Sequence, residues 1–170
     1  MRSYYVQGLD EKKNYQMFVR YMSAYSNAFS LVYFRYTENE RVKKSVRAIK
    51  KKLAPYKIST ERKTVLPSMV TLNEFHHIYE LAIYRTNFDT LDVLESAESI
   101  FDWDYPSRPM DLSFFQNGYA WFASSAHEQW NALYTEDKHI LQDLQDLGIQ
   151  AIAKENVALS SLYFDSNAEL

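Results

Sequence analysis

The chain has 170 residues, of which 46% are hydrophobic and 24% are charged, as expected of one globular domain that spans residues 1–170. It contains no cysteine, which excludes disulfides, thiolate zinc sites and cysteine nucleophiles and fits a reducing compartment, so we expect a cytoplasmic protein. No segment approaches the ~20 consecutive apolar residues that span a bilayer, so no membrane association is expected.

The net charge of −3 conceals an uneven distribution of charged residues. Residues 1–63 hold 15 Lys/Arg and 5 Asp/Glu, whereas residues 64–170 hold 4 Lys/Arg and 17 Asp/Glu. We favour the interpretation that the two parts attract each other within one domain. The alternative is a basic face that receives an acidic partner.

Two helices and a strand are predicted in the first third of the chain. Residues 10–26 predict a helix because apolar and aromatic side chains recur there at helical spacing. Residues 28–36 are apolar on both faces and predict an interior strand. A second helix should then begin at a capping box formed by Thr37 and Glu40 and end at Pro55, because the residue before a proline avoids the helical region.

The middle of the chain is predicted to alternate strand and helix. Residues 56–65 predict an exposed strand, and residues 75–85 predict another, although a helix also fits that short run. Asn87 or Asp89 can cap a third helix, and residues 105–109 form an irregular loop.

The last third contains the clearest local signal, which is Asn117-Gly118 between two aromatic runs. This pair predicts a type I′ hairpin turn because both residues tolerate positive φ. A short strand at residues 129–134 and a helix capped by Thr135 and ended by Gly148 should follow. Residues 154–170 are apolar enough to form a docked tail.

The fold class predicted is α+β, with an antiparallel sheet of about five or six strands and three or four amphipathic helices.

Two segments around this hairpin resemble a group of small uncharacterised bacterial proteins, some of which are labelled stage III sporulation proteins. The segments are residues 101–115 and residues 121–128, and the pattern of the group runs W-x-x-P-x-x-P-E-D-L-x-F-[YF], then a hairpin, then a strand that ends in H-E. The likeness in element order covers residues 28–147. Met110 stands where the pattern has glutamate, and a Trp-Pro-Gly-Thr stretch of the group is represented only by Val-Leu-Pro67-Ser. The resemblance implies an α+β fold and no activity.

His127-Glu128 is the best candidate for catalysis, because histidine titrates near neutral pH and a carboxylate can orient it. Adjacent strand residues point to opposite faces, so the two cannot cooperate directly in a regular strand. Arg108 and Asp111 precede the hairpin and could reach the same end of the sheet. We favour a structural role for all four, and we expect His127 to lie near the loop that holds Arg108 and Asp111. Ser124 and Ser125 lack the glycine-rich elbow of a serine hydrolase.

The basic run between residues 41 and 52 is the best candidate for binding. Its proposed contact residues are Arg41, Lys44, Arg47 and Lys51. Such a run could bind phosphates with release of counterions, but a solvated helix face explains the same residues. The sequence pI near 5.8 is also far below that of a typical nucleic-acid-binding domain.

No metal site and no cofactor are predicted. The adjacent His76 and His77 would face apart in a strand, and nothing in the spacing links them to Glu74 or His139. The chain has no H-E-x-x-H motif and no phosphate-binding loop.

We therefore expect a non-enzymatic protein-interaction or regulatory module whose partner is another protein and whose 14 tyrosines supply contact area. One alternative is a small hydrolase or transferase centred on His127. The other alternative is nucleic-acid binding through the helix at residues 41–52. The oligomeric state is left open.

Overall fold

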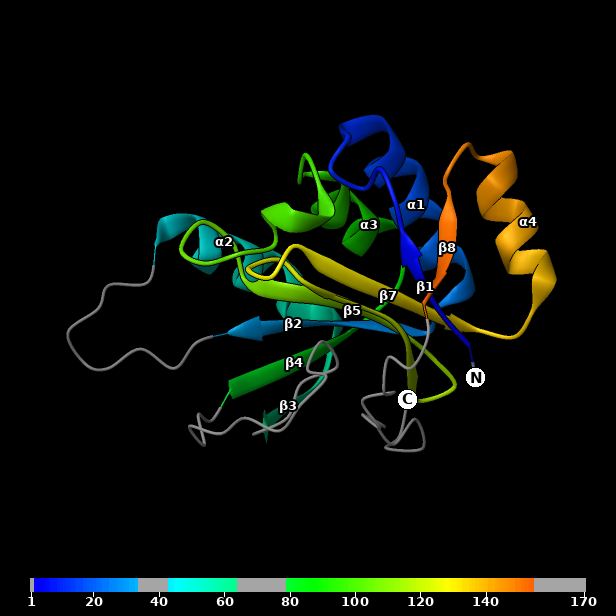
Figure 1. The fold of residues 1–170 in the computed structure, drawn as a ribbon. Helices are drawn as coiled ribbons and strands as arrows, with labels where there is room; N and C mark the ends of the chain where they lie inside the picture. Colours follow the sequence, from blue (N-terminus) through cyan, green and yellow to red (C-terminus); the bar gives the residue numbers. More distant parts are fainter. Residues whose placement is uncertain (1, 34–42, 64–78, 155–170) are drawn as a thin grey trace.

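A computed structural model describes residues 2–33, 43–63 and 79–154, and in this part of the chain four α-helices lie on one face of an eight-stranded antiparallel sheet (Figure 1). The α+β prediction is confirmed, whereas the predicted five or six strands were too few. The strand order is β3-β4-β2-β5-β6-β7-β1-β8. The strands are β1 Arg2–Val6, β2 Ala28–Tyr33, β3 Lys57–Lys63, β4 Tyr79–Arg85, β5 Met110–Gln116, β6 Tyr119–Ser125, β7 Trp130–Thr135 and β8 Ala151–Lys154. The helices are α1 Lys12–Tyr25, α2 Lys44–Leu53, α3 Phe88–Glu95 and α4 Lys138–Asp146, with short 3-10 turns η1 Ala54–Tyr56 and η2 Ile100–Asp102.

The two strands that the sequence did not predict are β1 and β8. Both are short; β1 pairs with β7, and β8 pairs with β1 at one end of the sheet. The side chain of Asn131 extends this pairing, because its Oδ1 accepts from the Val6 amide at 2.9 Å and its Nδ2 donates to the Val6 carbonyl at 3.1 Å. These strands are therefore defined by long-range pairing and carry little local pattern.

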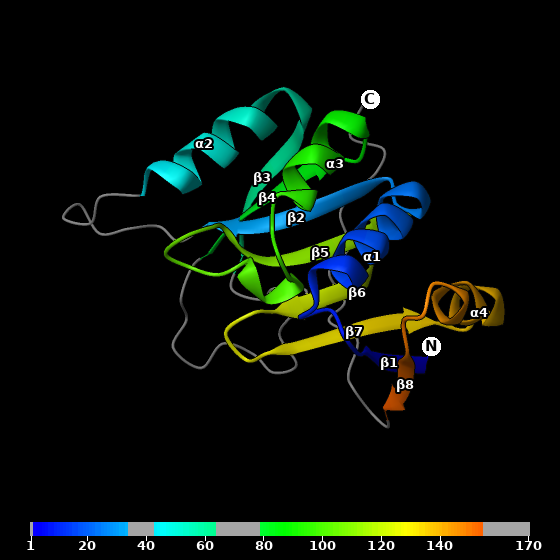
Figure 2. The ribbon, with the colours of Figure 1, turned by 90° about the horizontal axis from the view of Figure 1, so that it is seen from above.

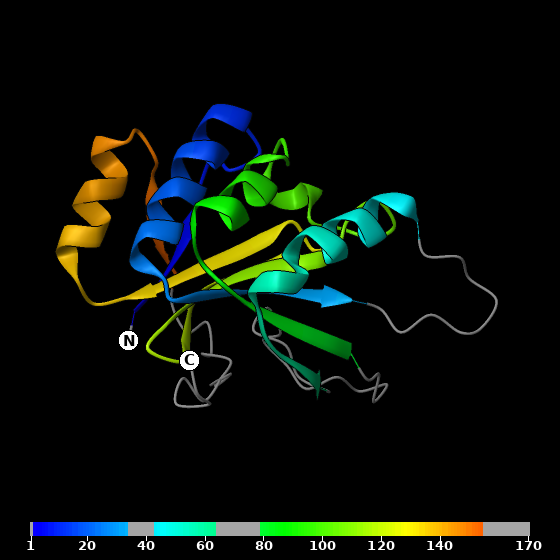
Figure 3. The same cartoon turned by 180° about the vertical axis from the view of Figure 1, so that it is seen from behind.

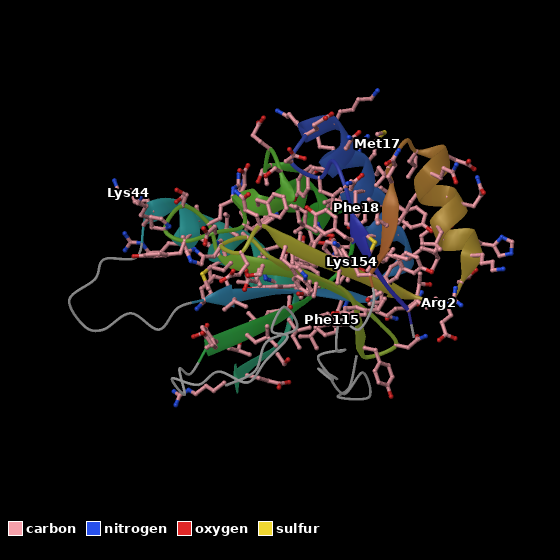
Figure 4. The ribbon with its side chains drawn as sticks, viewed as in Figure 1. Arg2, Met17, Phe18, Lys44, Phe115 and Lys154 are labelled. Carbon is pink, nitrogen blue, oxygen red and sulfur yellow. The ribbon has the colours of Figure 1, made fainter. Side chains whose placement is uncertain are left out.

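The helices cover the sheet from one side, as Figure 3 shows. Seen from above in Figure 2, α1 lies over the middle strands, α2 lies at the β3–β4–β2 end with α3 between it and α1, and α4 lies at the β1–β8 end. Between the layers, the ring of Phe18 on α1 packs edge-on against Phe122 on β6, with ring centroids 4.8 Å apart. Figure 4 shows Phe18 on this covered face and Phe115 on the opposite face.

Turn and capping residues in the sequence correctly predicted where several strands and helices begin or end. Asn117 and Gly118 have φ values of 51° and 84°, which confirms the type I′ hairpin between β5 and β6. Asn87 caps α3 in a reciprocal capping box with Thr90. Residues 34–36 of the predicted strand, the Thr37/Glu40 capping box, residues 64–65 and 75–78, and the tail after Lys154 lie outside the described residues.

Two helix ends differ from the prediction. The N-cap of α4 is Asp137 and not Thr135, because the Asp137 carboxylate accepts from the His139 amide at 2.8 Å; the Thr135 hydroxyl instead accepts from the Asp137 amide. Ala54, which precedes Pro55, does adopt the helical region, and the 3-10 turn η1 continues through the proline. None of the described helices is long and apolar enough to cross a membrane.

A row of small side chains crosses the sheet face that carries no described helix. Register pairs Ser30 with Ser113, Ser113 with Ala123, and Ala123 with Ala132, so the row runs over β2, β5, β6 and β7. All four residues are buried, and the hydroxyls of Ser30 and Ser113 have no hydrogen-bond partner among the described residues.

Ion pairs join the basic and acidic parts of the chain. Lys12 pairs with Glu98, Arg20 with Glu95 and Lys50 with Glu80. Each of these pairs, as far as the described residues go, takes its cation from residues 1–63 and its carboxylate from the rest of the chain. The pattern agrees with mutual attraction of the two parts within one fold.

Candidate functional site

A small cavity lies where β2 ends and β4 and β5 begin, next to α2. Its volume is about 240 Å³. Two buried valines, Val32 and Val46, and the buried Pro109 give it an apolar floor, and the rings of Tyr33 and Tyr105 add aromatic wall. The remaining lining residues are Met110, Arg47, Lys50, Arg108 and Glu80.

Two of the three cations at this cavity are already held by neighbours. Lys50 Nζ lies 2.6 Å from Glu80 Oε1 and 4.7 Å from the centre of the Tyr33 ring. The Arg108 guanidinium donates to the carbonyl and the hydroxyl of Ser96 at 2.6 and 3.0 Å. Arg47, by contrast, is exposed, and its guanidinium makes no hydrogen bond or ion pair with another described residue. Among the three cations that line the cavity, its charge is therefore the one available to a ligand as far as the described residues go.

The loop of residues 104–110 forms one wall of the cavity and is fixed by buried contacts. Trp103 donates from Nε1 to the hydroxyl of Tyr15 at 2.7 Å, and this hydroxyl donates to the carbonyl of Leu94 at 2.7 Å. Arg108 lies over the Trp103 ring, 5.2 Å from its centre. Ser45 at the start of α2 donates to the Ser107 carbonyl at 2.7 Å, so the loop is also tied to the helix.

Tyrosines near the cavity act as hydrogen-bond donors and not as bases. The hydroxyls of Tyr33 and Tyr84 lie 2.9 Å apart. Burial is the main cause that raises the pKa of Tyr84 to about 12, and burial also raises the pKa of Tyr33 well above its usual value of 10.0. Both groups keep their protons near neutral pH.

The outer surface of α2 is strongly basic. Lys43, Lys44, Arg47, Lys50, Lys51 and Lys52 are all exposed, and the helix contains no acidic residue. Only Lys50 among them has an ion-pair partner in the described part of the chain. Of the four predicted binding residues, Lys44, Arg47 and Lys51 lie on this surface, with Lys44 at the outer end of α2 (Figure 4), and Arg41 lies outside the described residues.

The candidate catalytic residues do not form one cluster. His127 and Glu128 are exposed on the turn between β6 and β7, and neither has a hydrogen-bond or ion-pair partner among the described residues. The buried Asp111 carboxylate accepts from the Ala126 amide at 3.1 Å, so the start of β5 does lie beside the turn that carries His127. Arg108 is engaged elsewhere, at Ser96. The Ser124 hydroxyl is buried and donates to the Leu112 carbonyl at 2.8 Å.

The other residues considered for metal binding are not brought together. His139 is exposed at the start of α4, and Glu74, His76 and His77 lie outside the described residues. A search of the described residues finds no group of three or more His, Asp or Glu that could hold a metal ion.

Sequence reasoning missed the participation of Tyr33, Glu80 and Tyr105 in the cavity. One signal for Glu80 was present, because it is the sole carboxylate in the apolar run of β4. No local signal connects that residue to Lys50, which pairs with it across 30 positions of the chain.

Comparison of the chain with protein-family models, with curated proteins and with solved structures finds no match.

Proposed function

We propose that this protein is a non-enzymatic interaction module whose basic α2 surface binds an acidic segment of another protein. The observation that carries the proposal is the stripe formed by Lys44, Arg47 and Lys51, three exposed cations without an ion-pair partner among the described residues. Unpaired cations on one rigid face give electrostatic complementarity to an acidic surface, which raises the association rate and selects the partner.

The geometry of α2 supports this stripe as a single surface. At ~100° per residue, the three side chains fall within an arc of roughly 60° on the helix. The buried residues Val46, Ile49 and Leu53 lie on the opposite side and fix which face is turned outward. The stripe is therefore held in place by the core and needs no ordering of the backbone when a partner binds.

A protein partner fits the surroundings of α2 better than a nucleic acid does. The described helix has ten residues and so spans ~15 Å, which is short for tracking a phosphate backbone. Carboxylates also lie beside it, since Glu80 pairs with Lys50 and Asp89 accepts from the Tyr56 hydroxyl just after the helix. These carboxylates interrupt the positive surface, so it matches a short acidic segment better than a continuous phosphate backbone.

The non-enzymatic part of the proposal is supported by the exposed position of His127 and by the engaged state of Arg108 and Ser124. A general base needs a positioned partner within ~2.6–3.2 Å, and no described group orients the His127 ring. We place the protein in the cytoplasm as part of the same proposal, because a chain without cysteine suits a reducing compartment.

The test is a binding titration with a fluorescein-labelled peptide that alternates glutamate and serine around one central tryptophan. Each exposed ion pair contributes ~0.2–1 kcal/mol. Loss of three in the variant Lys44→Gln/Arg47→Gln/Lys51→Gln should therefore weaken the Kd by roughly 3- to 150-fold.

The matched control makes the same change of charge away from α2. The variant Lys13→Gln/Arg85→Gln/Lys138→Gln replaces three other exposed cations and should bind the peptide within about twofold of the unmodified protein. Equal loss in both variants would mean that only net charge matters and would overturn the proposal. Tighter binding of random duplex DNA than of the peptide, abolished by the α2 variant, would replace it with nucleic-acid binding.

A further inference from the structure

We infer that the acidic partner segment carries an apolar or aromatic anchor residue, and that this side chain occupies the cavity between α2, the end of β2 and the loop of residues 104–110. The inference rests on the proposed function, because the cavity adjoins the basic stripe. Arg47 belongs to both, as a member of the stripe and as a lining residue of the cavity.

The size of the cavity suits one side chain. Its volume of about 240 Å³ lies below the ~300–1,000 Å³ of sites that enclose a whole small-molecule ligand. Anchors of protein interfaces are typically single large side chains that fill such pockets at the centre of a contact, surrounded by a polar rim. A single tryptophan, phenylalanine or leucine therefore matches the space better than a nucleotide or another cofactor.

The chemistry of the lining favours an apolar occupant over an anion. The floor is made by Val32, Val46 and Pro109, whose side chains are hydrocarbon. The Glu80 carboxylate also lines the cavity, and its partner Lys50 is occupied by it at 2.6 Å. An anion inside the cavity would meet this carboxylate and would have to break an existing ion pair, whereas an apolar group would leave the pair intact.

Negative charge on the partner instead belongs at the rim. Arg47 is exposed there without an ion-pair partner among the described residues, and Lys44 and Lys51 continue the positive surface along α2. The charged side chains in the walls are held in place. Arg108 binds Ser96 and lies over the Trp103 ring. Lys50 pairs with Glu80 and lies over the Tyr33 ring. The structure thus assigns a partner motif in which one large apolar residue is flanked by Asp or Glu.

Methionine-methyl NMR tests the inference on the unmodified protein. The chain has five methionines; Met110 lines the cavity, and Met17 on α1 (Figure 4) is a partly buried methionine that lines no part of it. Addition of the tryptophan peptide should shift the Met110 methyl signal through the ring current, and the same peptide with alanine in place of tryptophan should not. Neither peptide should shift the Met17 signal.

Binding titrations provide the second measurement. The tryptophan peptide should bind the unmodified protein at least tenfold more tightly than the alanine peptide. This preference should vanish in Met110→Trp, which fills the cavity, and persist in the control Met17→Trp, with the melting temperature of each variant recorded.

The possible failures are distinguishable. If both peptides bind equally and both depend on the α2 cations, the anchor inference is wrong and the proposed function stands. If the tryptophan preference exists but leaves the Met110 signal unmoved, the anchor lies elsewhere and the cavity assignment is wrong. If neither peptide binds, the proposed function is wrong as well.

Discussion

Replacement of Tyr15 by phenylalanine tests whether the buried contacts below the 104–110 loop hold the helix layer together. The Tyr15 hydroxyl accepts from Trp103 Nε1 and donates to the Leu94 carbonyl, both at 2.7 Å, and all three residues are fully buried. Tyr15→Phe keeps the ring but leaves the buried Trp103 Nε1–H unpaired, whereas the Leu94 carbonyl still accepts from the Ala97 amide at 3.3 Å. At ~1–3 kcal/mol for one unpaired buried donor, the loss should be about 1–3 kcal/mol.

Urea unfolding followed by tryptophan fluorescence measures this loss, and a chain of this size should also melt roughly 2–12 °C lower. The matched control is Tyr134→Phe, because Tyr134 is buried on the sheet but its hydroxyl has no hydrogen-bond partner among the described residues. It should change the free energy of unfolding by less than about 1 kcal/mol. The reasoning is refuted if Tyr15→Phe is no more destabilising than this control.

Three further outcomes are expected. Gly118→Val should destabilise by about 1 kcal/mol or more in a thermal melt, because a β-branched residue resists the φ of 84°; an unchanged melting temperature would contradict this. Asp111→Ala should lower the free energy of unfolding in urea by about 1–3 kcal/mol, since it unpairs the Ala126 amide, whereas His127→Ala should change it by less than about 0.5 kcal/mol; the reverse order would show that the turn is held by His127. Burial raises the pKa of Tyr84 and Tyr134 from 10.0 to about 12, so the stability from keeping them protonated is complete below pH 10 and is lost as the pH rises toward 12; urea midpoints that stay constant over this range would disprove it.

Elements with their own local chemistry were predicted correctly. The hairpin followed from Asn117-Gly118, and α3 followed from two candidate caps, Asn87 and Asp89, of which Asn87 is the one used. The end of α4 followed from Gly148, whose φ is 77°. In each case one or two residues favour a single backbone conformation, so the prediction did not depend on the rest of the chain.

Elements defined by distant partners were not predicted. Strand β1 pairs with β7 and β8, and four-residue β8 has too few positions to show a period. The N-cap of α4 moved from Thr135 to Asp137 because β7 continues through Thr135, which a local capping rule does not reveal.

The candidate site combines residues that the sequence placed in separate hypotheses. The sequence placed Arg108 in the candidate catalytic group with His127 and placed Arg47 in the candidate binding group of the basic run. In the structure, Arg108 and Arg47 line the same cavity. The link is tertiary, since Ser45 at the start of α2 binds the carbonyl of Ser107 62 positions further on. Residue types indicated which side chains could act, but only the packing of α2 against the loop showed which of them act together.

The position of β1 has a consequence for biosynthesis. Its pairing partners are β7 and β8, and the Val6 backbone binds the Asn131 side chain across 125 positions of the chain. While the ribosome has released the chain only as far as β6, β1 has neither of its neighbours, and the sheet lacks one side. Because this long loop must close before β1 can pair, the final folding step should be slow and should wait until β7 has left the ribosome.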